Sequence, residues 1–286
     1  MKLKELRSEG VRLLEQAAVV NAAYDARILL EYTLRENIDY LLLHGDDGIG
    51  KEDEDRYLKY INRRALHEPL QYITGYQEFM GLKFCVDKEV LIPRQDTECL
   101  VEEAMIEIQD NMRVLDVCTG SGCIIISLAK YKNGLYAVGS DISDGALETA
   151  RSNALLNEAD VKFVKGDIFS GLHNLESPFD VIISNPPYIR SKEISTLMEE
   201  VRDHEPVLAL DGGEDGLDFY RRILEETDKY LLPGGIILFE TGFDQGIEVA
   251  SLLKEKGFIN IDIIKDLNGL DRVVKGRRAI LKGSKD

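Results

Sequence analysis

The chain has 286 residues, of which 44% are hydrophobic and 30% charged, a balance that excludes extensive disorder and fits one large or two ordinary globular domains. Its 52 acidic residues against 35 basic residues give a net charge of −17, which disfavours an extensive nucleic-acid-binding face and favours a protein or small-molecule partner. No apolar run approaches the roughly 20 residues that cross a bilayer, and the first residues lack the apolar core of a signal peptide, so we expect a cytoplasmic protein that does not bind membranes.

The first 66 residues predict helices. Leucine and isoleucine recur near the helical period of 3.6 residues, from Leu3 and Leu6 onward, and no convincing strand appears. Residues 46–50 (Asp-Asp-Gly-Ile-Gly) predict a turn, and the acidic residues that follow favour the start of another helix. We therefore expect a small helical domain at residues 1–70.

Residues 71–92 predict a β-hairpin linker to a second domain. Short β-rich pieces at residues 70–73 and 82–86 are interrupted by Gly75 and Gly81, as in a hairpin. The domain boundary should lie in this stretch.

Residues 93–286 predict a doubly wound α/β domain. Strand-like and helix-like segments alternate, which is the pattern of a mostly parallel sheet with helices on both faces. An Asn-Gly pair at residues 268–269, between two strand-like runs, predicts a final hairpin and hence an antiparallel strand in an expected seven-stranded sheet. The predicted strands are residues 114–117, 136–140, 161–164, 181–184, 236–240, 258–265 and 272–281, and two of the predicted helices are residues 144–157 and 218–230.

The four cysteines and four histidines show no spacing typical of a metal centre. No Cys-x-x-Cys pair occurs, and the histidines lie singly along the chain. A cytosolic chain of this size needs no disulfides, so we expect free thiols and no bound metal, with metal ligation as the minor alternative. The cysteines are Cys85, Cys99, Cys118 and Cys123.

The first predicted strand ends in a glycine-containing turn. Ligands of open α/β sheets bind beyond the carboxyl ends of the strands, so these ends should carry the chemistry. In residues 116–123 (Asp-Val-Cys-Thr-Gly-Ser-Gly-Cys) the backbone N–H groups could approach a ligand closely, although a tight connection without a ligand is the alternative. A G-x-G-x-x-G motif starting at Gly120 would need a third glycine at Ile125, so a dinucleotide pyrophosphate site is disfavoured.

The next two strand ends each carry an aspartate. Asp141 suits hydrogen bonding to ribose hydroxyls, with a helix N-cap or a solvated turn as the alternative. Asp167, followed by Ile168, could face the amino group and ring of adenine, but an aspartate in an ordinary turn explains it equally well. Each signal is weak alone, and together they suggest a nucleoside-binding edge.

The fourth strand end reads Asn185-Pro186-Pro187-Tyr188. Proline has no N–H for a sheet, so a simple strand terminator explains one proline but not the whole motif. A planar amide or aromatic amine offers two donors and little basicity, so an asparagine oxygen and a backbone carbonyl can hold it while the tyrosine packs on it. The motif therefore predicts a site that positions a planar nitrogen.

These motifs together resemble those of the class I S-adenosylmethionine-dependent methyltransferases, in which Asn-Pro-Pro-Tyr marks methylation of a planar nitrogen. Arg64, residues 68–75 (Glu-Pro-Leu-Gln-Tyr-Ile-Thr-Gly) and residues 90–98 (Val-Leu-Ile-Pro-Arg-Gln-Asp-Thr-Glu) narrow the resemblance to the release-factor glutamine N5-methyltransferases, and it covers nearly the whole chain. Two positions depart from the family's pattern. Gln95 stands where a second proline is usual, and Cys118 stands where glycine is commoner.

The resemblance implies an enzyme that transfers a methyl group from S-adenosylmethionine to the side-chain amide nitrogen of the glutamine in the Gly-Gly-Gln motif of class-one peptide chain release factors. Asn185 and the Pro186 carbonyl would hold this amide. Pro187 would stiffen the loop, and Tyr188 would wall the pocket. No general base is implied. The implied cofactor site comprises Cys118, Thr119, Gly120, Ser121, Gly122, Asp141, Asp167, Ile168 and Asn185.

The resemblance also sets the expected partners and the alternatives. The helical domain would grip the release factor, and we expect a monomer that does not bind nucleic acid directly. A nucleic-acid methyltransferase acting on exocyclic amines is the nearest alternative, against which the net charge counts. A catalytically silent adaptor that senses S-adenosylmethionine and an NAD-dependent oxidoreductase are further alternatives. Arg94 could steer an acidic partner loop or pair with Asp96 or Glu98, and we favour the pairing.

Overall fold

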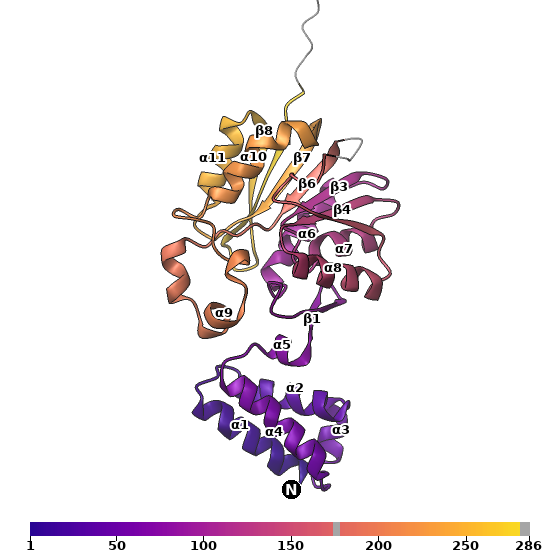
Figure 1. Ribbon diagram of the computed structural model, residues 1–286, viewed down its shortest axis with the longest axis vertical. Coiled ribbons are helices and arrows are strands. Elements are labelled where there is room, and N and C mark those ends of the chain that lie inside the picture. Colours follow the sequence, from indigo (N-terminus) through magenta and orange to yellow (C-terminus); the bar gives the residue numbers. More distant parts are fainter. Residues whose placement is uncertain (174–177, 281–286) are drawn as a thin grey trace, which may run out of the picture. The chain divides into compact units, whose positions relative to one another are not determined.

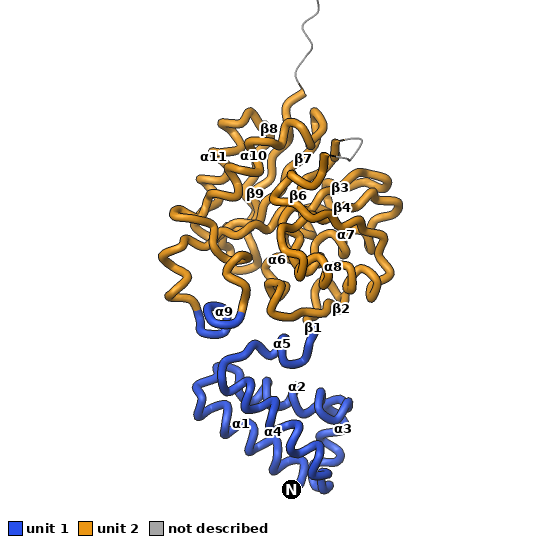
Figure 2. The backbone as a smooth tube through the Cα atoms, viewed as in Figure 1, with its two compact units in different colours: residues 1–76, 198–204 blue, residues 77–197, 205–286 orange. Residues whose placement is uncertain are grey.

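The computed structural model describes residues 1–173 and 178–280, which form two compact units (Figure 2). One unit comprises Met1–Tyr76 together with Met198–His204, and the other contains the remaining described residues. Among the described residues, no helix combines the length and the apolar character needed to cross a bilayer.

The first unit is a bundle of helices around its own core, as the periodicity of its leucines predicts (Figure 1). Leu6 and Leu14 of the first helix are fully buried, and so is Tyr57 of the fourth, whose hydroxyl donates to the Ala26 carbonyl at 3.1 Å. The helices are α1 (Leu3–Gln16), α2 (Ala22–Leu34), α3 (Ile38–Leu43), α4 (Lys51–Ala65) and α5 (Leu70–Thr74).

The short helix α5 corrects one expectation. Residues 70–73 were expected to be a β-rich piece, and they instead form one helical turn. Pro69 occupies the N-cap, and Gly75 occupies the C-cap with a left-handed φ of 81°, its N–H donating to the Gln71 carbonyl at 2.7 Å. In so short a segment the two caps decide the conformation, and the weak strand preference of its side chains does not.

A buried ion cluster links the two segments of the first unit. The Arg64 side chain is 5% exposed and donates to Asp25 at 2.7 Å. It also pairs with Glu200 of α9 (Glu199–His204), a helix that follows β6 (Phe179–Ser184) in the sequence. Removing one partner from such a cluster leaves an uncompensated buried charge, so α9 is an integral part of this unit.

The second unit contains a two-stranded sheet and a seven-stranded sheet. The small sheet pairs β1 (Tyr76–Phe79) with β2 (Leu82–Cys85). The large sheet has the order β5-β4-β3-β6-β7-β9-β8, in which β9 is antiparallel to both its neighbours, as expected from the Asn-Gly turn. Its strands are β3 (Arg113–Val117), β4 (Tyr136–Asp141), β5 (Val161–Lys165), β6 (Phe179–Ser184), β7 (Leu231–Glu240), β8 (Phe258–Lys265) and β9 (Asp271–Arg278). The predicted final strand ran to residue 281, which lies outside the described residues.

Helices cover both faces of the large sheet, so the predicted doubly wound fold is confirmed (Figure 1). Successive residues of one strand point to opposite faces: Ile183 of β6 joins one apolar cluster and Ile182 joins the other. The first cluster packs under α6 (Gln95–Glu107), α7 (Cys123–Tyr131) and α8 (Asp144–Leu156), and the second under α10 (Asp218–Tyr230) and α11 (Gly246–Glu255).

The site edge of the sheet follows from this topology. Strands β3, β4, β6 and β7 are parallel, so their carboxyl ends meet at one edge. The connection from β6 to α10 is long and irregular and contains two 3-10 turns besides α9, which are Ser191–Thr196 and Val207–Ala209.

Candidate active site

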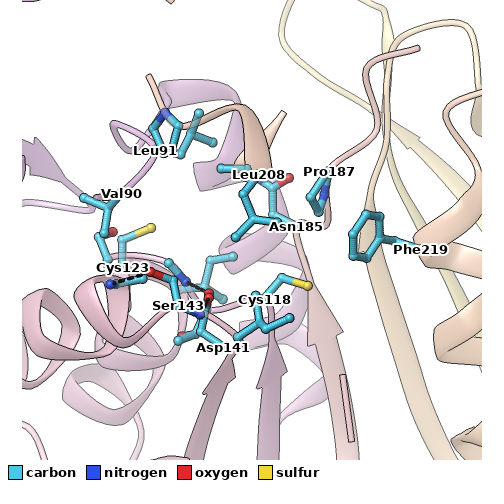
Figure 3. A pocket seen from close by; sticks show the side chains of 18 of the residues that line it. Val90, Leu91, Cys118, Cys123, Asp141, Ser143, Asn185, Pro187, Leu208 and Phe219 are labelled. Atoms are coloured by element: carbon cyan, nitrogen blue, oxygen red, sulfur yellow. Dashed lines mark hydrogen bonds between the residues drawn. The ribbon is translucent and has the colours of Figure 1, made fainter. Parts of the chain in front are cut away.

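A cavity of about 320 Å³ lies at the carboxyl ends of β3, β4 and β6, a volume within the range of small-ligand pockets. Figure 3 shows Asp141 and Cys118 at the strand ends, with Pro187 close to Phe219 on one side and Val90 with Leu91 on the other. The walls are mainly apolar, and many of the polar groups come from the loops that follow the strands.

The turn after β3 supplies backbone to the cavity. Cys118, Thr119, Gly120 and Ser121 line it, whereas Gly122 does not. A Cβ on Gly120 would meet no atom within 4 Å, so this glycine faces open space, and its φ of 54° lies in the left-handed region. A Cβ on Gly122 would come within 2.8 Å of Ile126, so this glycine serves the packing of the turn against α7. A ligand can therefore approach the backbone of this turn closely at Gly120.

Asp116 acts behind this turn, and does not line the cavity. It is fully buried, and the Thr119 hydroxyl donates to its Oδ2 at 2.6 Å. Burial raises the pKa of the Asp116 carboxyl to about 7, against the lowering effect of the hydrogen bond from Thr119. The Asp116 side chain therefore fixes the turn after β3 through Thr119, on the side away from the cavity.

Asp141 joins two loops at the edge of the cavity. Its Oδ2 accepts from the Gly120 N–H and its Oδ1 from the Ser143 N–H, both at 2.9 Å. The N-cap of α8 is Ser143, whose hydroxyl oxygen accepts from the Ala146 N–H, so Asp141 is not the cap that the alternative supposed. Burial raises the pKa of Asp141, and its backbone hydrogen bonds oppose the rise. Each oxygen keeps a further lone pair for a hydroxyl group in the cavity.

The turn after β5 places Asp167 and Ile168 at the cavity wall. Asp167 pairs with Arg222 of α10, its Oδ2 lying 2.6 Å from Nη2. Ile168 has a φ of 54°, a left-handed conformation that is strained for a β-branched residue, and its carbonyl accepts from the Ser140 hydroxyl at 3.3 Å. Arg222 and Phe219 also line the cavity, and the sequence offered no signal for either, because both lie on an otherwise ordinary amphipathic helix.

The Asn-Pro-Pro-Tyr segment is divided between the cavity and the interior. Asn185 and Pro187 line the cavity, and Pro186 and Tyr188 are not among its lining residues. The Tyr188 hydroxyl donates to Glu240 Oε1 at 3.2 Å behind the loop, and its ring packs against the second apolar cluster. Burial raises the pKa of this hydroxyl, which keeps it in the donating form.

Two residues near the mouth differ from expectation or were missed. Arg94 lines the cavity and pairs with the buried Glu205, and not with Asp96 or Glu98. Thr97, 2% exposed, accepts a hydrogen bond from Asn185 Nδ2 at 3.2 Å and was not singled out from the sequence. Its place at the start of α6 gives no local hint of a partner 88 residues away.

No group of three or more His, Cys, Asp or Glu side chains within residues 1–173 and 178–280 is arranged to hold a metal ion. The polar groups of the cavity include backbone amides, the side chains of Asp141, Asp167 and Asn185, one glutamate (Glu89), two arginines (Arg94 and Arg222) and several hydroxyl side chains. Such a set can bind a nucleoside-containing ligand and can hold a planar amide by hydrogen bonding.

Comparison with known proteins matches both units. Residues 5–75 match the family described as PrmC N-terminal domain, and residues 108–268 match a methyltransferase domain. A release factor glutamine methyltransferase of Clostridium acetobutylicum is 43% identical over 278 residues, covering 96% of this chain and 98% of the relative. One of Geobacter sulfurreducens is 42% identical, covering 92% of each. A methyltransferase structure from Pyrococcus furiosus superposes with a TM-score of 0.56 at 20% identity, covering 77% of this chain and 99% of that one, which shows the shared fold.

Proposed function

The chain belongs to the release factor glutamine methyltransferases, and from that premise we propose that it methylates the side-chain amide nitrogen of the glutamine in the Gly-Gly-Gln motif of class-one peptide chain release factors. The observation that carries the proposal is the placement of Asn185 and Pro187 at the wall of a cavity whose floor is the glycine turn after β3. An amide acceptor and a nucleoside-binding edge thus share one space.

The cavity fits S-adenosylmethionine, the methyl donor of this fold class. Gly120 leaves room for close backbone approach, so the turn at residues 118–121 would lie along the methionine portion. Asp141 would accept from the ribose hydroxyls, and Asp167 with Ile168 would meet the adenine. When bound, this cofactor supplies an electrophilic methyl group on a sulfonium sulfur.

The chain's contribution to the reaction is positioning. The Asn185 Nδ2 group is engaged by Thr97, which leaves Oδ1 to accept from the substrate amide. Pro186 does not itself line the cavity, but its carbonyl carbon is bonded to the nitrogen of Pro187, which does, and we propose that carbonyl as the second acceptor. Holding both amide hydrogens aligns the nitrogen for in-line attack. The loss of translational and rotational entropy then occurs on binding, so it does not add to the barrier of the reaction step. Formation of the C–N bond would be matched by cleavage of the methyl–sulfur bond, which leaves a neutral thioether. The nitrogen would become acidic as it gains the methyl group, so its proton would pass to water and no general base is required.

We further propose that the protein acts as a monomer on a cytoplasmic substrate, with the helical unit at residues 1–70 contacting the release factor outside its glutamine loop. The match of residues 5–75 to the PrmC N-terminal family supports this role for the helices. The net charge of −17 favours a protein substrate over nucleic acid.

A labelling experiment tests the proposal. The protein is incubated with methyl-labelled S-adenosylmethionine and, in separate reactions, a class-one release factor, the same factor with its Gly-Gly-Gln glutamine changed to alanine, duplex DNA and total RNA. We expect label only in the unaltered release factor. Label in nucleic acid, or equal label in the altered factor, would contradict it.

A further inference from the structure

A buried carboxylate lies behind the Asn-Pro-Pro-Tyr loop and has no part in the function proposed so far. Glu240 ends β7 and is 1% exposed. Tyr188 donates to its Oε1, while Oε2 has no hydrogen bond of standard geometry among the described residues. A buried acceptor left in this state calls for an explanation.

Thr97 connects this carboxylate to Asn185. The Thr97 hydroxyl lies near enough to Glu240 to lower the pKa of the carboxyl by hydrogen bonding. The same oxygen accepts from Asn185 Nδ2 at 3.2 Å. Its single proton is therefore free for the carboxylate, and the donors run in one direction, from the asparagine amide to the threonine hydroxyl to the glutamate.

This direction decides which end of the Asn185 amide faces the cavity. An ionised carboxylate only accepts, so the Thr97 proton must point to Glu240, and Thr97 can then only accept from Asn185. The asparagine must present NH₂ to the threonine and Oδ1 to the cavity. If the amide were reversed, Thr97 would lose its donor and the cavity would receive an NH₂ group.

The backbone around Glu240 is held as firmly as its side chain. Tyr220 donates to the Glu240 carbonyl at 2.8 Å. In the turn that follows β7, Gln245 donates from Nε2 to the Tyr188 carbonyl at 2.9 Å and accepts from the Gly242 N–H at 3.0 Å. The end of β7 and the turn after it thus fix the hydroxyl and the carbonyl of Tyr188, so the relay, the chain of hydrogen bonds from Asn185 through Thr97 to Glu240, ends in a rigid frame.

We propose that Glu240 is a positioning residue which, through Thr97, orients the Asn185 amide so that the site accepts the NH₂ of a glutamine and rejects the carboxylate of a glutamate. The proposal rests on the proposed function for the identity of the substrate amide. A glutamate side chain brings only acceptors to an oxygen-lined site, where no donor would satisfy them.

The charged groups around Glu240 set how it should respond to pH. Burial is the largest effect and raises the pKa of its carboxyl, as does Asp96 of α6. Thr97, Arg272 of β9 and Tyr188 lower it, and the resulting pKa is about 7. The hydroxyl of Tyr188 and that of Tyr220 stay protonated, because burial raises the pKa of each, and the thiol of Cys123 likewise. On acidification the carboxyl gains a proton, can donate to Thr97, and no longer dictates the direction of the relay.

The test uses isosteric variants of the full chain. Thr97→Val removes the hydroxyl, Thr97→Ser keeps it, and Glu240→Gln removes the charge. Thr227→Val, at a buried threonine of α10 whose hydroxyl bonds the Ile223 carbonyl, is the matched control. In wild type, kcat should fall as pH falls through about 7. Glu240→Gln should lack that fall, and because Asp116 titrates in the same range in every variant, only the difference between the two profiles counts.

We expect Thr97→Val to lower kcat for release-factor methylation about 10–100-fold, by analogy with the loss of a hydrogen bond that supports a metal ligand, with an unchanged Kd for S-adenosylmethionine. Thr97→Ser should recover most of the loss, and the control should match wild type. A release factor with glutamate in its motif should inhibit methylation of the unaltered factor more strongly in Thr97→Val than in wild type. Wild-type kcat and wild-type competition in Thr97→Val would overturn the proposal.

A spectroscopic measurement separates this inference from the proposed function. In protein labelled with ¹⁵N-asparagine, the Asn185 side-chain signal is assigned by its loss in Asn185→Ala. It should shift in Thr97→Val and with the titration of Glu240, and should not titrate in Glu240→Gln. If wild type fails to methylate a release factor, the proposed function fails, while this signal still decides the orientation of the amide. An Asn185 signal indifferent to both changes would refute the relay.

Discussion

The two sides of the cavity are built by different means. On the cofactor side, the contacts that fix the turns after β3 and β4 span short stretches of sequence: Thr119 bonds Asp116 three residues away, and Asp141 bonds Ser143 two residues away and Gly120 twenty-one residues away. The exposed pair of Asp167 and Arg222, 55 residues apart, is an exception. On the amide side, the fixing contacts span the chain, because Asn185 bonds Thr97 at a separation of 88 residues and Tyr188 bonds Glu240 at 52. Binding of the donor and alignment of the acceptor should therefore respond to different substitutions.

The largest expected effect comes from Asn185→Ala. The change removes the acceptor that holds the substrate amide but leaves the turn at Gly120 and the carboxylate of Asp141 intact. We expect kcat to fall on the order of 10²-fold or more, about 2.7 kcal/mol in transition-state stabilisation, with cofactor affinity retained. Single-turnover methylation and a separate cofactor titration measure the two quantities. Asn185→Asp, which keeps an acceptor of the same shape, should lie between alanine and wild type.

Asp141→Ala probes the opposite side. It removes the proposed ribose acceptor and frees the N–H groups of Gly120 and Ser143, so S-adenosylmethionine binding should weaken by about 1–3 kcal/mol. Calorimetry gives the affinity directly, and kcat at saturating cofactor should change less than affinity does. An affinity equal to that of wild type would show that Asp141 does not bind the cofactor, and would contradict the assignment of this side of the cavity to the cofactor.

Gln245→Ala tests the frame of the amide side. It leaves the buried Tyr188 carbonyl and the Gly242 N–H without their partner, so the free energy of unfolding should drop by about 1–3 kcal/mol. Urea denaturation measures the loss. The Kd for the cofactor should stay constant, and a parallel loss of cofactor affinity would show that the two sides are not separate.

Arg222→Ala should have the smallest effect. Its ion pair with Asp167 joins two side chains that are 45% and 47% exposed, and exposed pairs contribute about 0–1 kcal/mol. We expect the Kd for S-adenosylmethionine to rise less than about fivefold, with the rise reduced further at high salt. A larger change would assign Arg222 to direct cofactor contact.

The division between local and distant contacts also explains what sequence reasoning could reach. Helix α10 and strand β8 have the predicted bounds, because amphipathic and strand patterns are local properties. The turn at Gly120 and the position of Asn185 at a strand end were accessible for the same reason. The roles of Thr97 and Glu240 were not, since they depend on which segments the folded sheet brings together.

The errors follow the same rule. Residues 70–73 carry strand-favouring side chains, and the caps at Pro69 and Gly75 overrule them. Arg94 has two acids within four positions, yet it pairs with Glu205, 111 residues further on. Neighbours in sequence were the natural candidates for an ion pair, and only the path of the long connection after β6 brings Glu205 to it.

That long connection has a consequence for the order in which the protein is made. Met198–His204 completes the helical unit, and Glu200 reaches Arg64 across 136 residues of sequence. At ribosomal rates of about 5–20 residues per second, the nascent chain carries Arg64 for roughly 7–27 seconds before Glu200 is synthesised. During that interval Asp25 is the only other member of the cluster present, so the unit that emerges first is among the last to be finished.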